Sequence, residues 1–164
     1  MDKAGVYVFY GNGAGKTSAA IGLCLRRLGE GRTAVVVQFL KGSDAEKKGE
    51  LLKRLEPELK FFSFEKNEEK FSELDPEHKE EEMENIRNGL NFVRKVISTG
   101  GCDVLVLDEI LGLVEHQILS ADALAEMISS RPEEMEMILT GDRIDDRIRS
   151  CADIISKVTD ESKT

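Results

Sequence analysis

Short apolar runs alternate with segments of helical periodicity along the whole chain. The apolar runs are rich in β-branched residues, which is typical of strands buried on both faces. We expect strands at residues 6–10, 33–40, 59–64, 104–107, 135–139 and 154–158. Between them, capping residues and apolar periodicity predict helices at residues 16–28, 45–55, from 76 to the glycines at 100–101, 120–130 and 145–151.

The alternation of strand and helix predicts the fold class. Right-handed crossovers between successive strands give an α/β protein, in which helices flank a mainly parallel sheet of about five to six strands. No long linker or internal repeat divides the chain. We therefore expect residues 1–164 to form a single domain.

The first expected strand runs directly into a glycine-rich loop that opens a helix. Glycines make room for a ring of backbone N–H groups around a phosphate, and the positive end of the helix faces the same point. The expected phosphate-binding residues are Gly11, Asn12, Gly13, Ala14, Gly15, Lys16, Thr17 and Ser18. Lys16 would reach a terminal phosphate oxygen, and the Thr17 hydroxyl suits Mg²⁺ held between phosphates.

This loop departs from the common G-x-x-x-x-G-K-[ST] pattern at one position. Tyr10 occupies the place of the first glycine, and Gly11 follows one residue later. The alternative to nucleotide binding is a glycine-rich turn without a ligand. The strand before the loop and the Gly-Lys-Thr that opens the helix favour nucleotide binding.

Asp108 and Glu109 follow the apolar run at residues 104–107. The carboxyl ends of parallel strands meet at one edge of a sheet, so Asp108 is expected beside the loop, where it would assist Thr17 in holding Mg²⁺. Glu109 would orient a ligand, bind metal or act as a base. Without the loop, an ordinary turn that carries carboxylates would explain both residues.

Two further groups of polar residues have open interpretations. Thr140 and Arg143 flank Gly141 and Asp142 after another strand, and either substrate contact or a simple turn explains them. His78 and His116 lack metal-binding spacing and are expected at the surface.

The chain has a formal net charge of -9, and most of the acidic excess falls between residues 65 and 84. This charge argues against a nucleic-acid partner, because phosphate backbones favour basic surfaces. The three cysteines show no paired spacing and are expected to be reduced thiols. The amino-terminal residues contain no long apolar segment, so we expect a cytoplasmic protein without a membrane anchor.

Several linked motifs resemble those of the phosphate-loop ATP:corrinoid adenosyltransferases, which transfer the 5′-deoxyadenosyl group of ATP to cobalt(I) of a corrinoid. The similarity extends from about Val6 to Val158. It lies in residues 11–20 (GNGAGKTSAA), 29–31 (GEG), 37–42 (VQFLKG), 106–109 (VLDE), 131–132 (RP), 140–141 (TG) and 152–154 (ADI).

The resemblance implies a phosphate-loop NTPase-like (RecA-like) fold and a transferase that uses ATP as co-substrate and Mg²⁺ as cofactor. It assigns catalytic roles to Lys16, Thr17, Asp108 and Glu109, and a role on the corrinoid side to Gln38, Lys41 and Phe71. It further implies cobalamin or a precursor as substrate, a reductase such as a flavoprotein, and a possible homodimer. Asn12 is expected to contact the nucleoside.

The chain departs from the family pattern at several places. Ala14 replaces a lysine, Asp142 replaces an arginine, and no tryptophan is present to form the aromatic pair over the corrinoid. The sequence also ends at Thr164, before the family's usual carboxyl-terminal extension. Two alternatives stay open. One is a phosphate-loop NTPase or kinase in which Glu109 activates water or an acceptor hydroxyl. The other is a noncatalytic ATP-binding relative, for which these departures would be signs of lost activity.

Overall fold

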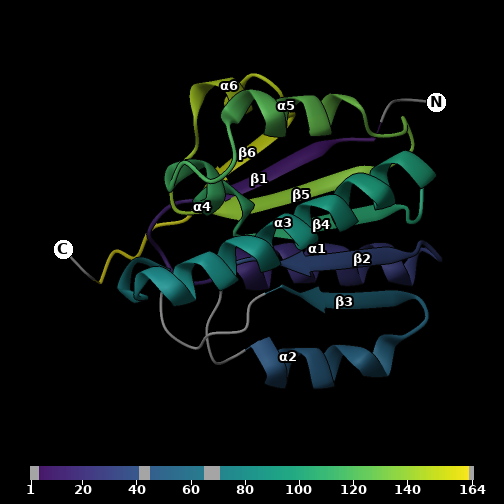
Figure 1. Cartoon of the computed structure of the whole chain (residues 1–164). Helices are drawn as coiled ribbons and strands as arrows, with labels where there is room; N and C mark the ends of the chain where they lie inside the picture. Colours follow the sequence, from purple (N-terminus) through teal and green to yellow (C-terminus); the bar gives the residue numbers. More distant parts are fainter. Residues whose placement is uncertain (1–3, 41–44, 65–70, 163–164) are drawn as a thin grey trace.

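A six-stranded parallel sheet forms the centre of the molecule (Figure 1). The computed structural model describes residues 4–40, 45–64 and 71–162, so Lys41 lies outside the described residues. The strand order is β3-β2-β4-β5-β1-β6, and every neighbouring pair is parallel. The strands are β1 (Val6–Tyr10), β2 (Ala34–Gln38), β3 (Leu59–Ser63), β4 (Val104–Asp108), β5 (Glu136–Gly141) and β6 (Ile154–Lys157).

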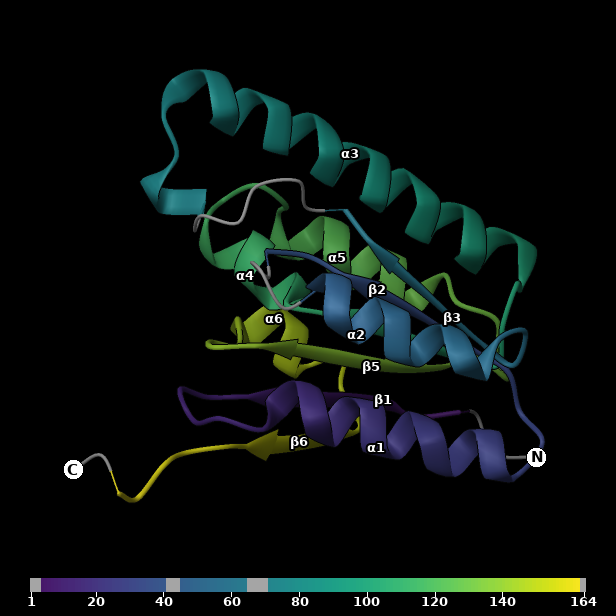
Figure 2. The same cartoon turned by 90° about the horizontal axis from the view of Figure 1, so that it is seen from below.

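Helices cover both faces of the sheet, as predicted for an α/β fold. Cys24 of α1 and Leu52 of α2 pack in one buried cluster, whereas α3 to α6 pack in the other. Figures 1 and 2 show the long helix α3 and helix α1 on opposite sides of the sheet. The helices are α1 (Lys16–Gly29), α2 (Ala45–Leu52), α3 (Pro76–Thr99), α4 (Ile110–Glu115), α5 (Ala121–Ser129) and α6 (Asp146–Arg149).

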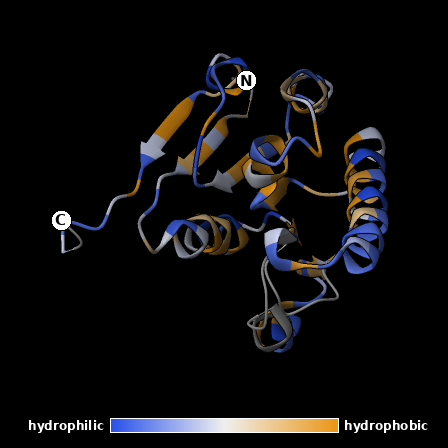
Figure 3. Cartoon of the chain, turned by 60° about the vertical axis from the view of Figure 1, so that its left-hand side comes forward, coloured by the Kyte–Doolittle hydropathy of each residue, from blue (hydrophilic) through white to orange (hydrophobic). Residues whose placement is uncertain are grey.

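Local sequence signals explain where several of these elements begin and end. The Asp75 carboxylate caps α3 by accepting a hydrogen bond from the His78 N–H, and Gly100 ends this helix with a left-handed backbone. Ser120 caps α5 in the same way as Asp75 caps α3. Figure 3 shows that the strands are largely hydrophobic and that hydrophilic and hydrophobic residues are interspersed along α3. The strands lie in the core, and α3 buries only part of its surface.

Some predicted boundaries are wrong. The helix expected at residues 45–55 ends at Leu52 and continues as a 3₁₀ turn, Lys53–Leu55, before Pro57. The strand expected at residues 33–40 covers only Ala34–Gln38, and the backbone turns at Leu40, where φ is 53°. The last predicted helix, 145–151, is shortened to α6.

Helix α4 was not predicted from the sequence. Its residues Ile110 to Leu113 are all buried, so the segment shows no alternation between apolar and polar faces. The left-handed backbone of Glu109, with φ of 63°, turns the chain from β4 directly into this helix. Gly141 makes room for it, because a Cβ there would lie 2.3 Å from the Cβ of Leu111.

The sheet register brings the polar strand ends to one edge. Gln38 of β2 pairs with Asp108 of β4, and Thr140 of β5 pairs with Phe9 of β1. Strand β5 thus separates the strand that leads into the glycine-rich loop from the strand that ends in Asp108. This arrangement places Thr140 between the loop and Asp108.

The three cysteines provide a test of the core. Burial raises the pKa of the Cys24 thiol to about 11 and that of Cys102 to about 12, and these residues are 0% and 8% exposed. We expect a thiol-specific disulfide reagent at about pH 8 to modify only the half-buried Cys151 in the folded protein. Mass spectrometry of the labelled protein checks this; fast labelling of Cys24 would contradict the packing of α1.

Across the ranges given above, no helix combines the length and the apolar character that a membrane crossing requires.

His78 and His116 are exposed, as predicted. His78 lies 2.7 Å from Asp75 Oδ1, and this contact raises the pKa of the imidazole.

Candidate nucleotide site

The glycine-rich loop joins β1 to α1 and presents the amino-terminal end of α1 to the carboxyl edge of the sheet. Gly15 caps the helix in a left-handed conformation, with φ of 106°. The first turn of α1 contains no acidic residue, so nothing there opposes the positive end of the helix dipole. Both features suit the binding of an anion at this end of α1.

Lys16 is held inside the loop. Its side chain is 9% exposed, and its ammonium group donates to the Gly11 carbonyl oxygen and to Asp142 Oδ1, each at 2.5 Å. Asp142 follows β5 and its side chain is 61% exposed. The one lysine of the loop is therefore paired with a carboxylate that comes from another strand end.

The segment after β6 crosses the loop. The Val158 carbonyl accepts a hydrogen bond of 2.9 Å from the Gly13 N–H, and the Ala14 N–H donates to both carboxylate oxygens of Asp160 at 3.2 Å. A Cβ at Gly13 would lie 2.9 Å from the backbone of Thr159. This close approach explains why glycine is needed at that position.

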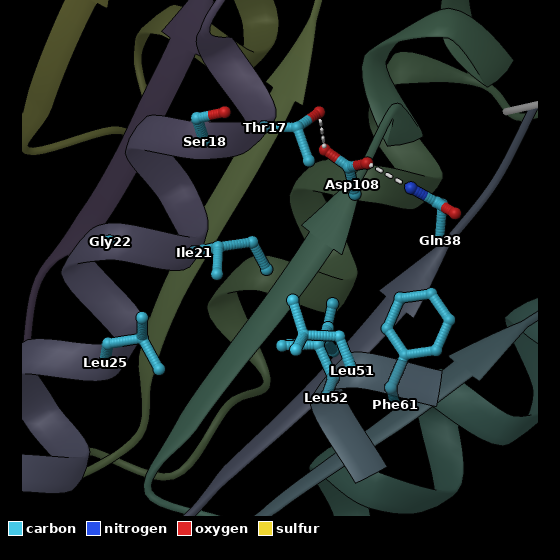
Figure 4. A pocket seen from close by; sticks show the side chains of 11 residues that line it. Thr17, Ser18, Ile21, Gly22, Leu25, Gln38, Leu51, Leu52, Phe61 and Asp108 are labelled. Atoms are coloured by element: carbon cyan, nitrogen blue, oxygen red, sulfur yellow. Dashed lines mark hydrogen bonds between the residues drawn. The ribbon is translucent and has the colours of Figure 1, made fainter. Parts of the chain in front are cut away.

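Asp108 lies at the centre of a polar cluster beside the loop (Figure 4). It is 1% exposed. Thr17 Oγ1 and Thr140 Oγ1 donate to its Oδ1 at 2.9 and 2.7 Å, and Gln38 Nε2 donates to its Oδ2 at 2.9 Å. Side chains from three other segments of the chain thus fix the position of one buried carboxylate.

Glu109 lies at the edge of this cluster and is half-buried. Its N–H donates to Thr140 Oγ1 at 2.8 Å, so the Thr140 hydroxyl joins Asp108 and Glu109. A non-glycine residue with a left-handed backbone is uncommon and marks a position that the surrounding structure constrains. The turn at Glu109 is therefore fixed relative to Asp108.

A mostly apolar cavity of about 290 Å³ adjoins the cluster between α1 and α2 (Figure 4). Thr17, Gln38 and Asp108 form its polar end. Its remaining wall consists of Ser18, Ile21, Gly22, Leu25, Val36, Leu51, Leu52 and Phe61. Gln38 Oε1 is buried and has no hydrogen-bond partner within the described part of the chain, so it offers an acceptor at this end.

A second, more polar hollow of about 660 Å³ lies on the other side of the loop. Tyr10 and Asn12 form part of its wall, together with the cations Arg143, Arg149 and Lys157. The Arg143 guanidinium contacts Glu115 at 3.5 Å, and that of Arg149 lies 5.5 Å from the centre of the Tyr10 ring.

The residues at the sheet edge fit Mg²⁺ bound together with a phosphate. Mg²⁺ prefers oxygen ligands and completes its shell with substrate phosphates and water rather than with a full cage of side chains. The Thr17 hydroxyl and the Asp108 carboxylate provide adjacent oxygens. Among the described residues, no group of three or more His, Cys, Asp or Glu side chains is placed to hold a metal ion.

The structure thus brings together most residues that the sequence singled out. Lys16, Thr17, Asp108, Glu109 and Gln38 gather at one edge of the sheet. Phe71 begins a short 3₁₀ turn, Phe71–Glu73, and only its backbone is described. Three contacts were missed: Asp142 on Lys16, Asp160 on Ala14, and Thr140 on Asp108. Only Thr140 and Asp142 could be anticipated from the sequence: both follow an apolar run that predicts a strand, as Asp108 does, and so both are expected at the same edge of the sheet.

The parallel sheet and the loop that joins β1 to α1 define a phosphate-loop NTPase-like fold. The assembled ATPase EscN from the enteropathogenic E. coli type III secretion system has a similar fold, with a TM-score of 0.54 at 15% identity. The match covers 96% of this chain and 43% of that chain.

Sequence comparison identifies the family. The model of the ATP:corrinoid adenosyltransferase BtuR/CobO/CobP family matches residues 2–163, and the chain belongs to that family. The corrinoid adenosyltransferase of Escherichia coli (strain K12) is 28% identical over 159 residues, which cover 96% of this chain and 78% of the relative. CobA of Salmonella typhimurium (strain LT2), also named a corrinoid adenosyltransferase, is 27% identical over 157 residues, covering 93% and 75%.

Proposed function

We propose that residues 11–18 hold the triphosphate of ATP while the 5′-deoxyadenosyl group passes to cobalt(I) of a corrinoid. The observation that carries this assignment is the hydrogen bond between Thr17 and the buried Asp108, beside the only lysine of the loop. Membership of the adenosyltransferase family fixes the reaction class as group transfer from ATP to a corrinoid.

The reaction needs no nucleophile from the protein. The electron pair of cobalt(I) forms a bond to C5′ of ATP, the bond between C5′ and its oxygen breaks, and that electron pair leaves with triphosphate. The cobalt becomes formally cobalt(III). The protein therefore contributes by positioning the two substrates and by stabilising the negative charge of the leaving group.

Each residue at the sheet edge has a role in this scheme. The Lys16 ammonium and the loop N–H groups bind phosphate oxygens, and the positive end of α1 adds to their field. Thr17 and Asp108 would hold Mg²⁺, which supplies charge neutralisation for triphosphate. Thr140 and Gln38 keep the Asp108 carboxylate in place. Glu109, next to Asp108, orients the bound substrates.

The cavity between α1 and α2 suits the nucleoside half of ATP. It begins at Thr17 and Asp108, where the phosphates would lie, and the rest of its wall is mostly apolar. The unpartnered Gln38 Oε1 offers a hydrogen-bond acceptor to an exocyclic amine or a ribose hydroxyl. Asn12, on the opposite side of the loop, is the other candidate contact for the nucleoside.

The corrinoid side is proposed from the family resemblance. Lys41 and Phe71 follow β2 and β3 along the chain, and Gln38 ends β2. We propose that a reductase such as a flavoprotein supplies the electron that gives cobalt(I), and that the protein acts in the cytoplasm as a homodimer. The formal charge of -9 argues against a nucleic-acid partner.

The family match does not favour the other two hypotheses, an NTPase or kinase and a noncatalytic relative. An assay that supplies the protein with chemically reduced cobalt(I) corrinoid, ATP and Mg²⁺ distinguishes the three hypotheses. We expect a light-sensitive cobalt–carbon product, which is detected by its absorption spectrum before and after illumination. ADP with phosphate would indicate an NTPase, and ATP binding without any product would indicate a noncatalytic protein.

A further inference from the structure

Two of the groups in the loop that would bind an anion are already hydrogen-bonded to carboxylates of the protein itself. Asp142 accepts a hydrogen bond from the ammonium group of Lys16, and Asp160 accepts one from the N–H of Ala14. Both partners are carboxylates, and each carboxylate oxygen is chemically similar to a phosphate oxygen as a hydrogen-bond acceptor. They come from two different places in the chain, the end of β5 and the segment after β6.

The geometry of these contacts makes them competitors of a polyphosphate. The Lys16 side chain is 9% exposed, and two of the three N–H donors of its ammonium group already bond to the Gly11 carbonyl and to Asp142. A phosphate gains the donor that Asp142 holds only when this carboxylate moves away. The Asp142 side chain is 61% exposed and can move into solvent at little cost.

The hydrogen bond between Asp160 and the Ala14 N–H is supported by the packing of residues 158–160, which we call the tail, against the loop. Val158 accepts from the Gly13 N–H, and Thr159 lies against Gly13 where any Cβ would collide with it. Asp160 is thereby positioned over the next amide, that of Ala14. Freeing the Ala14 N–H requires at least the Asp160 side chain to leave.

We propose that Asp142 and Asp160 are internal competitors of the ATP phosphates and set the affinity of the loop for polyphosphate. This inference rests on the proposed binding of phosphates at residues 11–18. When the carboxylates occupy the loop, only the fraction of molecules with a free Lys16 binds without a penalty, and the apparent affinity falls by that fraction. The same contacts re-form as triphosphate leaves, so they favour product release.

The test measures binding of inorganic tripolyphosphate with Mg²⁺ by titration calorimetry, which needs neither nucleoside nor corrinoid. We expect Asp142→Asn to bind the probe about threefold to fivefold more tightly than the unmodified protein, and Asp160→Asn roughly threefold more tightly. Asp145→Asn is the matched control, because it removes the same charge three residues from Asp142 and the Asp145 side chain accepts from the Arg147 N–H. We expect it to change affinity less than about twofold.

Amide hydrogen exchange reports the contact with the tail directly. We expect the Ala14 N–H to exchange faster in Asp160→Ala, which has no side-chain acceptor, than in the unmodified protein, and equal rates would overturn the role of Asp160. Unchanged or weaker tripolyphosphate binding in Asp142→Asn would overturn the role of Asp142. If these failures occur while Lys16→Ala still weakens binding of the probe about tenfold or more, the phosphate site stands and only the competitor inference falls. If the unmodified protein does not bind the probe, both fall.

Discussion

Lys16→Ala will weaken ATP binding and lower turnover by about tenfold or more. Lys16 is the one lysine or arginine among residues 11–18, and its loss removes a charge-assisted contact to phosphate worth about 1.5–3 kcal/mol. The change also leaves Asp142 without its partner, so its negative charge would face the triphosphate unopposed. Calorimetric titration of ATP and steady-state rates measure the effect.

Folding is expected to survive this substitution. The partner of Lys16 in the ligand-free protein is mostly exposed, so the pair contributes at most about 1 kcal/mol to stability. Lys95→Ala, on the exposed face of α3, is the control for a lost lysine away from the loop. Unchanged ATP affinity in Lys16→Ala would show that the loop does not hold the phosphates.

Asp108→Asn will reduce magnesium-dependent turnover by about thirtyfold or more, because it removes the negative charge of the carboxylate that accepts the hydrogen bond of Thr17. Its stability should change much less. The new amide N–H group can point toward Gln38, whose side chain can rotate and present its unpartnered Oε1 as the acceptor. The hydrogen bonds from Thr17 and Thr140 to the remaining oxygen are kept.

Glu136→Gln is the control, because this variant should lose stability instead of magnesium-dependent activity. Glu136 is a buried carboxylate at the start of β5, where it pairs with Arg27 and Arg32. We expect this variant to lose stability and keep its magnesium dependence, whereas Asp108→Asn should lose activity and keep its stability. A magnesium titration and thermal unfolding of both variants separate the two. Equal magnesium dependence in Asp108→Asn and the unmodified protein would remove Asp108 from the metal site.

The sheet and the loop could be predicted because their signals are local. Strands buried on both faces are continuous apolar runs, and each run in this chain became a strand of the sheet. Asp108 and Lys16 could be placed together because parallel strands bring their carboxyl ends to one edge. Helix α4 gave no such signal, since nearly all of its residues are buried.

The contacts that occupy the loop could not be predicted in this way. Asp142 and Lys16 are 126 residues apart, and Asp160 and Ala14 are 146 residues apart. Their meeting depends on β6 pairing beside β1 and on β5 lying between β1 and β4. Strand order is a property of the whole sheet, and no single segment of the sequence carries it.

The bond of ATP that breaks tests the central claim most directly. A single turnover with cobalt(I) corrinoid, ATP labelled at C5′ and Mg²⁺ should place the label on cobalt and release one intact triphosphate for each cobalt–carbon bond. Phosphorus NMR measures the released triphosphate, and chromatography measures the labelled corrinoid. Release of phosphate or ADP, with the label still in a nucleotide, would contradict the assignment.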